Sequence, residues 1–431
     1  MRKLAIIGSG IAGLGCAWFL RRDHDVTVLE ADDHAGGHAN TIPVGEGPGS
    51  VALDTGFMVF NPVTYPCLTR LFGILGVPVR ATDMSFSVRH VQRDIEFSGS
   101  SFNHLFAQRR NILRPSFIRM LLRIDRFNRE ATAALGDPAV GGMDLDAYLR
   151  RGGYGADFRD LYLVPMASAV WSAPREQMLR FPAATLLRFF HNHGFLGLHT
   201  QHQWWTVVGG ARAYVERLTR HFRDRILMRT PVRRVRRTRS GVEVTTDGGP
   251  TLYDRVVMAC HPPATLALLG DDATPAERRL LTPFRYQPNT ATVHTDRSVM
   301  PRRRLAWSAW NHRLDASQGR PPTTHYWLNR LQGIAGEVDY FVSINGAHLV
   351  RPERVLRTVD YEHPLFDQAA VEAQAGIAGL NAAARSGSET YFAGAWQRYG
   401  FHEDGLLSAV NLAALLHGGD PWPRAGAEGA S

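Results

Sequence analysis

Apolar residues near the N-terminus follow the order strand, turn, helix, strand. Residues 4–7 form a short continuous apolar run, residues 14–20 are apolar or small, and residues 25–29 form a second run that ends at Glu30. A continuous apolar run bounded by glycine is typical of a parallel strand with both faces buried. The pattern therefore predicts a βαβ unit and an α/β fold.

The pattern changes in the middle of the chain. Residues 84–218 contain longer helical stretches with many aromatic residues, and residues 115–129 predict an amphipathic helix. Its apolar side chains share one arc, while Arg119, Arg123 and Arg126 fall on the opposite face. Such a helix either buries its apolar face in a core and solvates its arginines, or lies on anionic lipid headgroups. The sequence leaves both interpretations open.

Later segments predict further strands and a tail. Residues 254–260 are typical of a buried strand, and residues 292–295 and 325–328 are rich in β-branched and aromatic residues, as strands are. Residues 418–431 are rich in glycine, alanine and proline, so we expect a flexible tail.

A glycine-rich turn joins the first strand to the first helix. Gly8 permits the tight turn, Gly10 lets the backbone approach a pyrophosphate, and Gly13 lets the helix pack on the strand. The phosphates would lie at the helix N-terminus, and Glu30 can accept hydrogen bonds from ribose hydroxyls. The residues that we expect to contact this dinucleotide are Gly8, Gly10, Ile11, Ala12, Gly13, Glu30 and Ala31.

Further glycines favour FAD over NAD. A glycine pair begins six residues after Glu30, and glycines recur after the strand-like segments that end near residues 54 and 393. A turn at residues 403–409 leads into a helix whose N-terminus would stabilise negative charge on a reduced flavin. No second dinucleotide fingerprint is visible, so a stably bound NAD(P)H is not expected. The additional cofactor contacts that we expect are Gly36, Gly37, His38, Thr55, Gly56, Phe57, Gly394, Asp404, Gly405 and Leu406.

These segments resemble the amine oxidase and phytoene desaturase superfamily of flavoproteins. The resemblance rests on GSGIAGLG, DTGF, WTVVGGARAYVERL, TPVRRV and GFHEDGLLSA, which occur in that order along the chain. It implies an amine-oxidase-like fold with FAD as cofactor. It also implies that the backbone at Val232 binds the adenine and that residues 404–406 lie against the flavin.

A narrower resemblance points to lipids. Residues 165–172, residues 189–194 and the pair Gly37-His38 are similar to a bacterial group described as predicted NAD/FAD-binding proteins, and to the N-terminal domain of plant cyclopropane fatty acid synthases. This resemblance implies a fatty acyl substrate and a lipid methyltransferase as a partner.

The chain also departs from amine oxidases. His38 replaces the arginine that many of them carry after the glycine pair, and Lys3, in the first strand, is the only lysine, so none can lie near flavin N5. Trp396 and Tyr399 occupy the region of the amine oxidase aromatic cage. We take Tyr399 as the candidate substrate-facing catalytic residue. We take His193 as the candidate for proton transfer, because an imidazole near its ordinary pKa suits a general base. We expect no metal.

Cofactor-like and substrate-like segments alternate along the chain. We expect a discontinuous Rossmann-like FAD-binding domain and a mixed α+β substrate domain. The FAD-binding ranges are residues 1–83, 207–265 and 386–417, and the substrate ranges are residues 84–206 and 266–385.

Composition and charge restrict the partners and the cellular location that we expect. The chain has 431 residues and a net charge of +9, which suggests acidic partners, and no motif supports nucleic acid. Three scattered cysteines, no signal-peptide pattern and no apolar run of about 18 residues predict a cytoplasmic protein. We expect it to be peripheral on the inner membrane face at most.

The leading expectation is an FAD-dependent oxidoreductase that oxidises or desaturates a fatty acyl chain of a membrane lipid by hydride transfer to flavin N5. The first alternative is an amine oxidase, against which the missing lysine counts. The second is a non-catalytic FAD-bound partner of a lipid methyltransferase.

Overall fold

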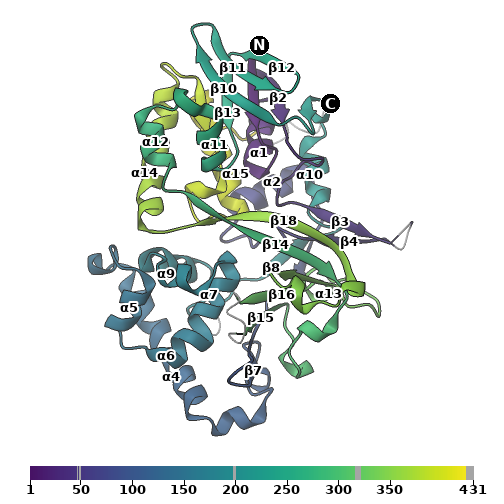
Figure 1. The fold of residues 1–431 in the computed structure, drawn as a ribbon, viewed down its shortest axis with the longest axis vertical. Helices are drawn as coiled ribbons and strands as arrows, with labels where there is room; N and C mark the ends of the chain where they lie inside the picture. The colour runs from purple at the N-terminus through teal and green to yellow at the C-terminus, as the bar shows by residue number, and fades with distance from the viewer. Residues whose placement is uncertain (46, 48–49, 198–199, 316–321, 424–431) are drawn as a thin grey trace.

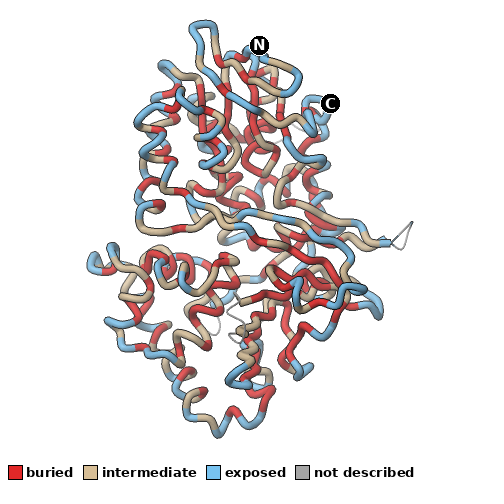
Figure 2. Tube along the Cα trace, viewed as in Figure 1, coloured by how far each residue is buried: buried red, intermediate tan, exposed pale blue. Residues whose placement is uncertain are grey.

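The computed structural model has two lobes joined by long strands (Figure 1). It describes residues 1–45, 47, 50–197, 200–315 and 322–423, so the end of the expected tail, residues 424–431, lies outside the described residues. The predicted α/β fold is confirmed. Most buried residues of the upper lobe lie in its central layers (Figure 2).

A five-stranded parallel sheet forms the centre of the upper lobe. Its order is β19-β13-β1-β2-β9. The strands are β1 (Arg2–Ile7), β2 (His24–Leu29), β9 (Ile226–Leu227), β13 (Arg255–Met258) and β19 (Thr390–Phe392). They come from the two ends and the middle of the chain, which is the discontinuity that the sequence indicates.

Both faces of this sheet are buried, which explains the unbroken apolar run of β1. Leu4 and Ile6 pack toward α1 (Ile11–Leu20) and α15 (His402–His417). Ala5 and Ile7 face the opposite core, which includes Val242 of the antiparallel layer. Because successive side chains of a strand point to opposite faces, a strand covered on both sides needs apolar residues at every position.

An antiparallel layer and several helices complete the upper lobe. The layer has the order β10-β11-β12. Its strands are β10 (Val232–Thr238), β11 (Gly241–Thr246) and β12 (Gly249–Tyr253). The other helices of this lobe are α2 (Pro66–Leu75), α10 (Arg212–Thr219), α11 (Pro262–Leu269), α12 (Pro275–Leu281) and α14 (Gln368–Ala384).

A seven-stranded sheet links the lobes. Its order is β18-β14-β17-β16-β15-β6-β7. Two predicted strands lie within it, and one is much longer than expected, because β14 pairs with β18 over ten positions. The strands are β6 (Phe86–His90), β7 (Ile95–Ser98), β14 (Arg285–His294), β15 (Trp310–Leu314), β16 (Thr323–Trp327), β17 (Phe341–Ile344) and β18 (Val355–Leu365). Two strand pairs stand apart: β3 (Thr41–Val44) with β4 (Val51–Asp54), and β5 (Val79–Thr82) with β8 (Trp204–Val207).

Helices fill the rest of the lower lobe, including the predicted amphipathic one. These helices are α3 (Phe102–Leu105), α4 (Pro115–Ala134), α5 (Leu145–Arg151), α6 (Gly155–Phe158), α7 (Val164–Trp171), α8 (Arg175–Leu179), α9 (Ala183–Asn192) and α13 (Leu328–Leu331). In the described part of the chain, no helix is long and apolar enough to cross a bilayer.

The arginines of α4 do not form a free basic face. Arg119 pairs with Asp157 at 2.9 Å, and Arg126 donates to Glu130 and to the carbonyl of Gly152. This face packs on α6 through these contacts. Two of the three arginines on this face are thus paired within the protein, and contact of α4 with headgroups stays a prediction.

Candidate functional site

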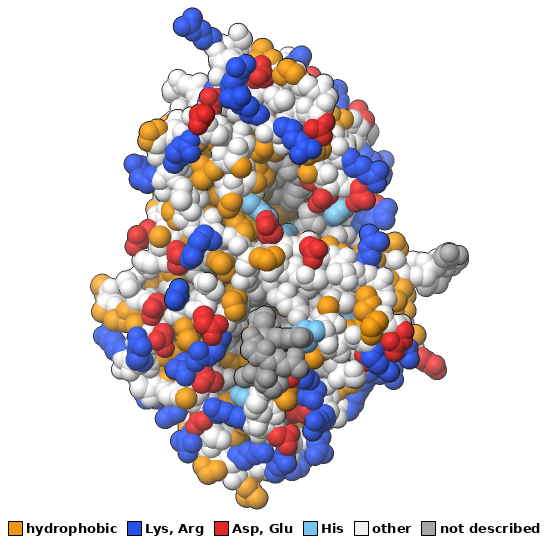
Figure 3. All heavy atoms as spheres, viewed as in Figure 1, with side chains coloured by type: hydrophobic (Ala, Val, Ile, Leu, Met, Phe, Trp, Pro, Cys, Tyr) orange, Lys and Arg blue, Asp and Glu red, His pale blue; other side chains and the backbone are white. Residues whose placement is uncertain are grey.

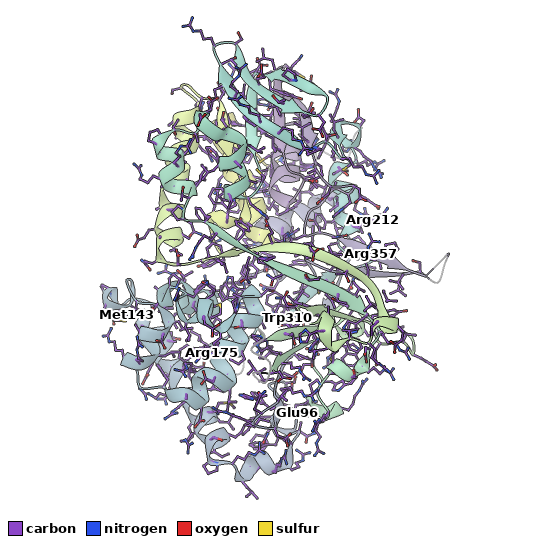
Figure 4. The ribbon with its side chains drawn as sticks, in the orientation of Figure 1. Glu96, Met143, Arg175, Arg212, Trp310 and Arg357 are labelled. Atoms are coloured by element: carbon purple, nitrogen blue, oxygen red, sulfur yellow. The ribbon has the colours of Figure 1, made fainter. Side chains whose placement is uncertain are left out.

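One large cavity runs through both lobes. Its volume is about 2020 Å³, about twice the upper end of the range of roughly 300–1,000 Å³ usual for small-molecule sites. The wall begins at the glycine turn after β1, passes between β18 and α15, and ends against α3 and α4. Trp310, on β15 and on the cavity wall, lies in the lower lobe (Figure 4). A cavity of this size has room for a dinucleotide and for a substrate.

The first glycine turn leaves open space where a phosphate is expected. Gly10 precedes α1 with extended backbone angles, and a Cβ atom placed on it would meet no protein atom within 4 Å. Gly13 instead packs tightly, since a Cβ there would lie 2.0 Å from the carbonyl oxygen of Gly8. These two environments match the separate roles that the sequence assigns to the glycines.

The second glycine turn packs against the first. The amide of Gly36 donates to the carbonyl of Ser9 at 2.9 Å, and a Cβ on Gly37 would lie 3.2 Å from the Cα of Gly10. Gly36 and Gly37 both have positive φ angles, 119° and 56°, which favour glycine. Two backbone turns thus share one wall at the end of the cavity.

Glu30 organises this end of the cavity. One carboxylate oxygen accepts hydrogen bonds from the amide and the hydroxyl of Ser9, at 2.7 and 2.5 Å, and the other accepts from the amide of Asp32 at 2.9 Å. A carboxylate has about four acceptor sites, so one remains for a ribose hydroxyl. The structure therefore gives Glu30 a second task, holding the glycine turn in place.

His38 lies in an aromatic wall that the sequence did not reveal. Its ring stacks on Tyr361 with centroids 4.7 Å apart, and the ring of His363 is 5.3 Å away. The buried Nε2 of His38 has no hydrogen-bond partner, and burial lowers the pKa of the ring well below its usual value. A neutral imidazole with a free nitrogen that lines the cavity can bind a polar group of a ligand.

The first half of the DTGF segment makes structural hydrogen bonds, and the second half lines the cavity. Asp54 accepts hydrogen bonds from Thr41 and from the amide of Ala211, and burial raises its pKa to about 7. Thr55 is buried and bonds the hydroxyl of Tyr361 at 2.6 Å. Gly56 and Phe57 reach the cavity wall. Asp54 and Thr55 thus position the two residues that follow them.

The start of α15 closes the cofactor end of the cavity. The Asp404 carboxylate accepts from the amides of Phe401 and Tyr399, at 2.9 and 3.2 Å, and burial raises its pKa to about 7. Gly405 packs on Ile11, because a Cβ there would lie 2.7 Å from that side chain. Leu406 is fully buried. Asp404, Gly405 and Leu406 therefore fix the helix end and have no place on the cavity wall.

Glu403 joins two helices that the sequence did not connect. Its two carboxylate oxygens accept hydrogen bonds from the amides of Cys67 and Leu68, each at 2.9 Å, in the first turn of α2. Helices leave their first amides without partners, and a carboxylate at that position also suits the helix dipole. Glu403 thereby anchors α2 to the start of α15.

Aromatic rings surround the middle of the cavity. His193 stacks on Phe189 with centroids 3.8 Å apart, and Phe401 stacks on the same ring at 5.1 Å. The Nδ1 of His193 lies 2.9 Å from the carbonyl of Phe189. A carbonyl can only accept, so Nδ1 carries the proton and Nε2 is left as an acceptor. Burial lowers the pKa of His193 to about 4, so the ring is neutral at pH 7.

Tyr399 and Trp396 line different parts of the wall. Tyr399 contacts the edge of Phe189 at 5.5 Å and accepts a hydrogen bond from Trp171 through its carbonyl. Trp396 is buried against Phe284, with centroids 4.8 Å apart. Tyr399 is therefore grouped with His193, whereas Trp396 packs toward the core.

An apolar arm continues from this aromatic group to the end of the lower lobe. It leads between α7 and β6 to α4, where Leu121 and Ile124 contribute to its wall. The residues that line the arm are Met84, Phe86, Phe97, Leu105, Leu121, Ile124, Tyr162, Met166, Ala169 and Val170. Such a passage suits a long hydrocarbon chain.

The cavity brings together most, though not all, of the residues that the sequence singles out. Those on its wall are Gly8, Gly10, Ile11, Ala12, Glu30, Gly36, Gly37, His38, Gly56, Phe57, His193, Gly394 and Tyr399. Those outside its wall are Gly13, Ala31, Thr55, Val232, Asp404, Gly405 and Leu406. The cofactor and catalytic roles of both groups stay predictions.

Sequence analysis missed the wall opposite the glycine turns. Tyr361 and His363 are two residues apart on β18, so both side chains point to the same face, toward His38. The alternation of side chains along a strand was the sequence signal that could have grouped these two residues. Nothing in the sequence showed that β18 lies beside Gly37, more than 300 residues earlier.

The low pKa of His193 predicts a pH dependence of stability. The folded pKa of about 4 lies below the ordinary value of 6.5, so the unfolded chain binds more protons between these pH values. The stabilisation is complete above about pH 6.5 and is lost as the pH falls toward 4, by about 1.4 kcal/mol per pH unit. Urea unfolding from pH 7.5 to 5 should show a shallower acid loss in His193→Gln than in wild type. An unchanged slope in His193→Gln, or an equal change in a control substitution at the exposed His191, contradicts this assignment.

Comparisons with known proteins agree with this geometry. The sequence profile of the family described as flavin containing amine oxidoreductase matches residues 11–343. A Mycobacterium tuberculosis protein named as a flavin-containing monoamine oxidase is 26% identical over 291 residues, which are 64% of this chain and 61% of that protein.

Two solved structures have a similar fold. Cyclohexylamine oxidase from Brevibacterium oxydans has a TM-score of 0.67 at 16% identity, covering 96% of this chain and 99% of its own. A fatty acid isomerase from P. acnes that produces CLA has a TM-score of 0.65 at 15% identity, covering 95% and 97%. At these identities the likeness concerns the fold alone.

Proposed function

The chain belongs to the flavin containing amine oxidoreductase family, and we propose that it uses FAD to oxidise or desaturate a fatty acyl chain of a membrane lipid. The family establishes the flavin, and the acyl substrate is the proposal. The observation that carries it is the apolar arm, which continues from the aromatic group around His193 to α4.

The residues present fit FAD. Gly10 offers a backbone surface with no protein atom within 4 Å of its Cβ position, at the N-terminus of α1 where an anion is favoured. Glu30 retains an acceptor site for a ribose hydroxyl, and His38, whose buried Nε2 has no hydrogen-bond partner among the described residues, lines the cavity farther along. When bound, FAD supplies an acceptor for two electrons and a proton taken up as hydride.

The chain's own residues would position the acyl chain and exclude water. Phe189, Phe401 and His193 form a stacked group that lines the passage between the two ends of the cavity. Because His193 is neutral with Nε2 unprotonated, it can accept a hydrogen bond or a proton from substrate. Desaturation removes a hydride and a proton, so Nε2 of His193 would be the group that takes the proton while bound FAD would take the hydride.

Amine oxidation is the second candidate, because the Mycobacterium tuberculosis relative is named as a monoamine oxidase. Two features count against it. Lys3 is the only lysine, and its side chain lies on β1 outside the cavity wall. Most side chains that line the arm are apolar, which favours a hydrocarbon chain over an ammonium group. The fatty acid isomerase with a similar fold shows only that the fold is compatible with an acyl substrate.

Displacement of a fluorescent polyene fatty acid tests the substrate class by binding alone. The holoenzyme should bind the probe in one-to-one ratio, and octadecenoic acid should displace it while putrescine does not. Displacement by putrescine at similar concentration, or failure of the probe to bind, overturns the acyl proposal in favour of an amine or another small substrate.

A further inference from the structure

The apolar arm reaches the surface at the end of the lower lobe. Phe102, on α3, lines the cavity and is nevertheless 78% exposed, so the cavity opens beside it. Asp125, on α4, also lines the cavity, and its side chain is 74% exposed. The opening therefore lies between α3 and α4, at the far end from the glycine turns.

Exposed apolar side chains occur on α3, on α4 and on the turn between them. Apart from Met1, the three most exposed large apolar side chains among the described residues are Leu113 at 84%, Phe102 at 78% and Leu122 at 68%. Ile112, next to Leu113, is 51% exposed. We call Phe102, Ile112, Leu113 and Leu122 the apolar rim. Figure 3 shows hydrophobic side chains at the lowest point of the molecule, with basic side chains just above them.

The rim is held in place by a defined structure. The Ser101 hydroxyl accepts from the amide of His104 at the start of α3. Behind the 3₁₀ turn Arg109–Leu113, buried Asn111 donates to the carbonyl of Glu96 at 3.3 Å. Ile112 and Leu113 therefore project outward from an anchored turn, and their exposure is a property of the fold.

The charge around the rim is positive. Residues 97–124 contain five arginines and no aspartate or glutamate, and Asp125 follows directly. Of these arginines, Arg110 and Arg119 pair with Asp94 and Asp157. In the described part of the chain, Arg109 and Arg114 donate to carbonyl and amide oxygens and to no carboxylate, so their charges are not neutralised. Exposed Arg302 and Arg303 lie beside α3, where their amides bond the carboxylate of Glu96.

We propose that the apolar rim inserts into an anionic phospholipid bilayer and that the acyl chain enters the cavity directly from the membrane. Stable attachment of a peripheral protein takes two signals, and here inserted apolar side chains are combined with unneutralised arginines. Phe102 belongs both to the rim and to the cavity wall, so docking and substrate entry would use the same surface. The entry step rests on the proposed function, whereas docking does not.

Vesicle sedimentation tests docking without turnover. The holoenzyme should sediment with vesicles of phosphatidylcholine and phosphatidylglycerol and stay in solution with phosphatidylcholine alone. Leu113→Asp, outside the cavity wall, should bind the anionic vesicles at least about tenfold more weakly, because a charge replaces an inserted side chain. The matched control is Leu252→Asp, on β12 in the other lobe (Figure 1), where the side chain is 46% exposed.

The outcomes separate this proposal from the proposed function. Wild-type binding by Leu113→Asp, equal loss in Leu252→Asp, or no preference for anionic vesicles overturns docking by the rim. Leu113→Asp should reduce its flavin at the wild-type rate with detergent-dispersed lipid and more slowly with vesicles. Docking through Leu113 without any flavin reduction by lipid would leave the membrane proposal standing and remove the acyl substrate.

Discussion

Gly10→Ala is expected to lose FAD while keeping its fold. The backbone angles of Gly10, φ −64° and ψ 176°, are accessible to alanine, and the added methyl group meets no protein atom. It would instead project into the space where the pyrophosphate approaches the backbone. We expect FAD affinity to fall at least about tenfold, or ~1.4 kcal/mol, as measured by fluorescence titration of the apoprotein.

The matched control is Gly73→Ala. Gly73 is an exposed glycine of α2 that also has no atom within 4 Å of its Cβ position, yet it lies outside the cavity wall. Its FAD affinity should equal that of wild type, and circular dichroism of both apo variants should match. Full FAD affinity in Gly10→Ala would show that the cofactor lies elsewhere.

Ile124→Trp is expected to separate long acyl substrates from short ones. Ile124 lines the arm from α4, so an indole there would fill the passage between the aromatic group and the opening. Flavin reduction by an octadecenoyl lipid should slow at least about tenfold, because overfilling a packed passage forces the chain out. Reduction by an octanoyl lipid should slow less, because its shorter chain occupies less of the narrowed passage.

Arg129→Trp provides the control on the same helix. Arg129 is 73% exposed, pairs only with Asp125 of its own helix and is absent from the cavity wall, so the substitution adds an indole to the surface. Exposed pairs of this kind contribute little stability. Equal slowing for both chain lengths in Ile124→Trp, or slowing in Arg129→Trp, would contradict the assignment of the arm to the acyl chain.

Local patterns predicted the cofactor half of the fold well. The run at residues 4–7 and the glycine turn report local geometry, because a buried parallel strand and a tight turn each restrict the residues that can form them. The strand at residues 292–295 was found but shortened, since β14 begins at Arg285 with polar, partly exposed residues. That segment owes its strand conformation to pairing with β18, which the sequence does not display.

The candidate site shows the same division. Gly10 and Gly37 could be placed on the cavity wall because each belongs to a glycine pattern of a few consecutive residues. The wall formed by Tyr361 and His363 could not, because it depends on how β18 crosses between the lobes. The rim at Leu113 was also missed, since exposure of an apolar residue is decided by tertiary packing and not by helical periodicity.

Anaerobic reduction of the bound flavin tests the central claim most directly. The purified holoenzyme should lose its flavin absorbance on titration with unsaturated phospholipid, and mass spectrometry should find the product two hydrogen atoms lighter. A polyamine mixture, added in parallel, should leave the spectrum unchanged. Reduction by the amines alone would establish amine oxidation and contradict the acyl assignment. Reduction by neither would contradict both, and would favour a non-catalytic FAD-bound partner of a lipid methyltransferase.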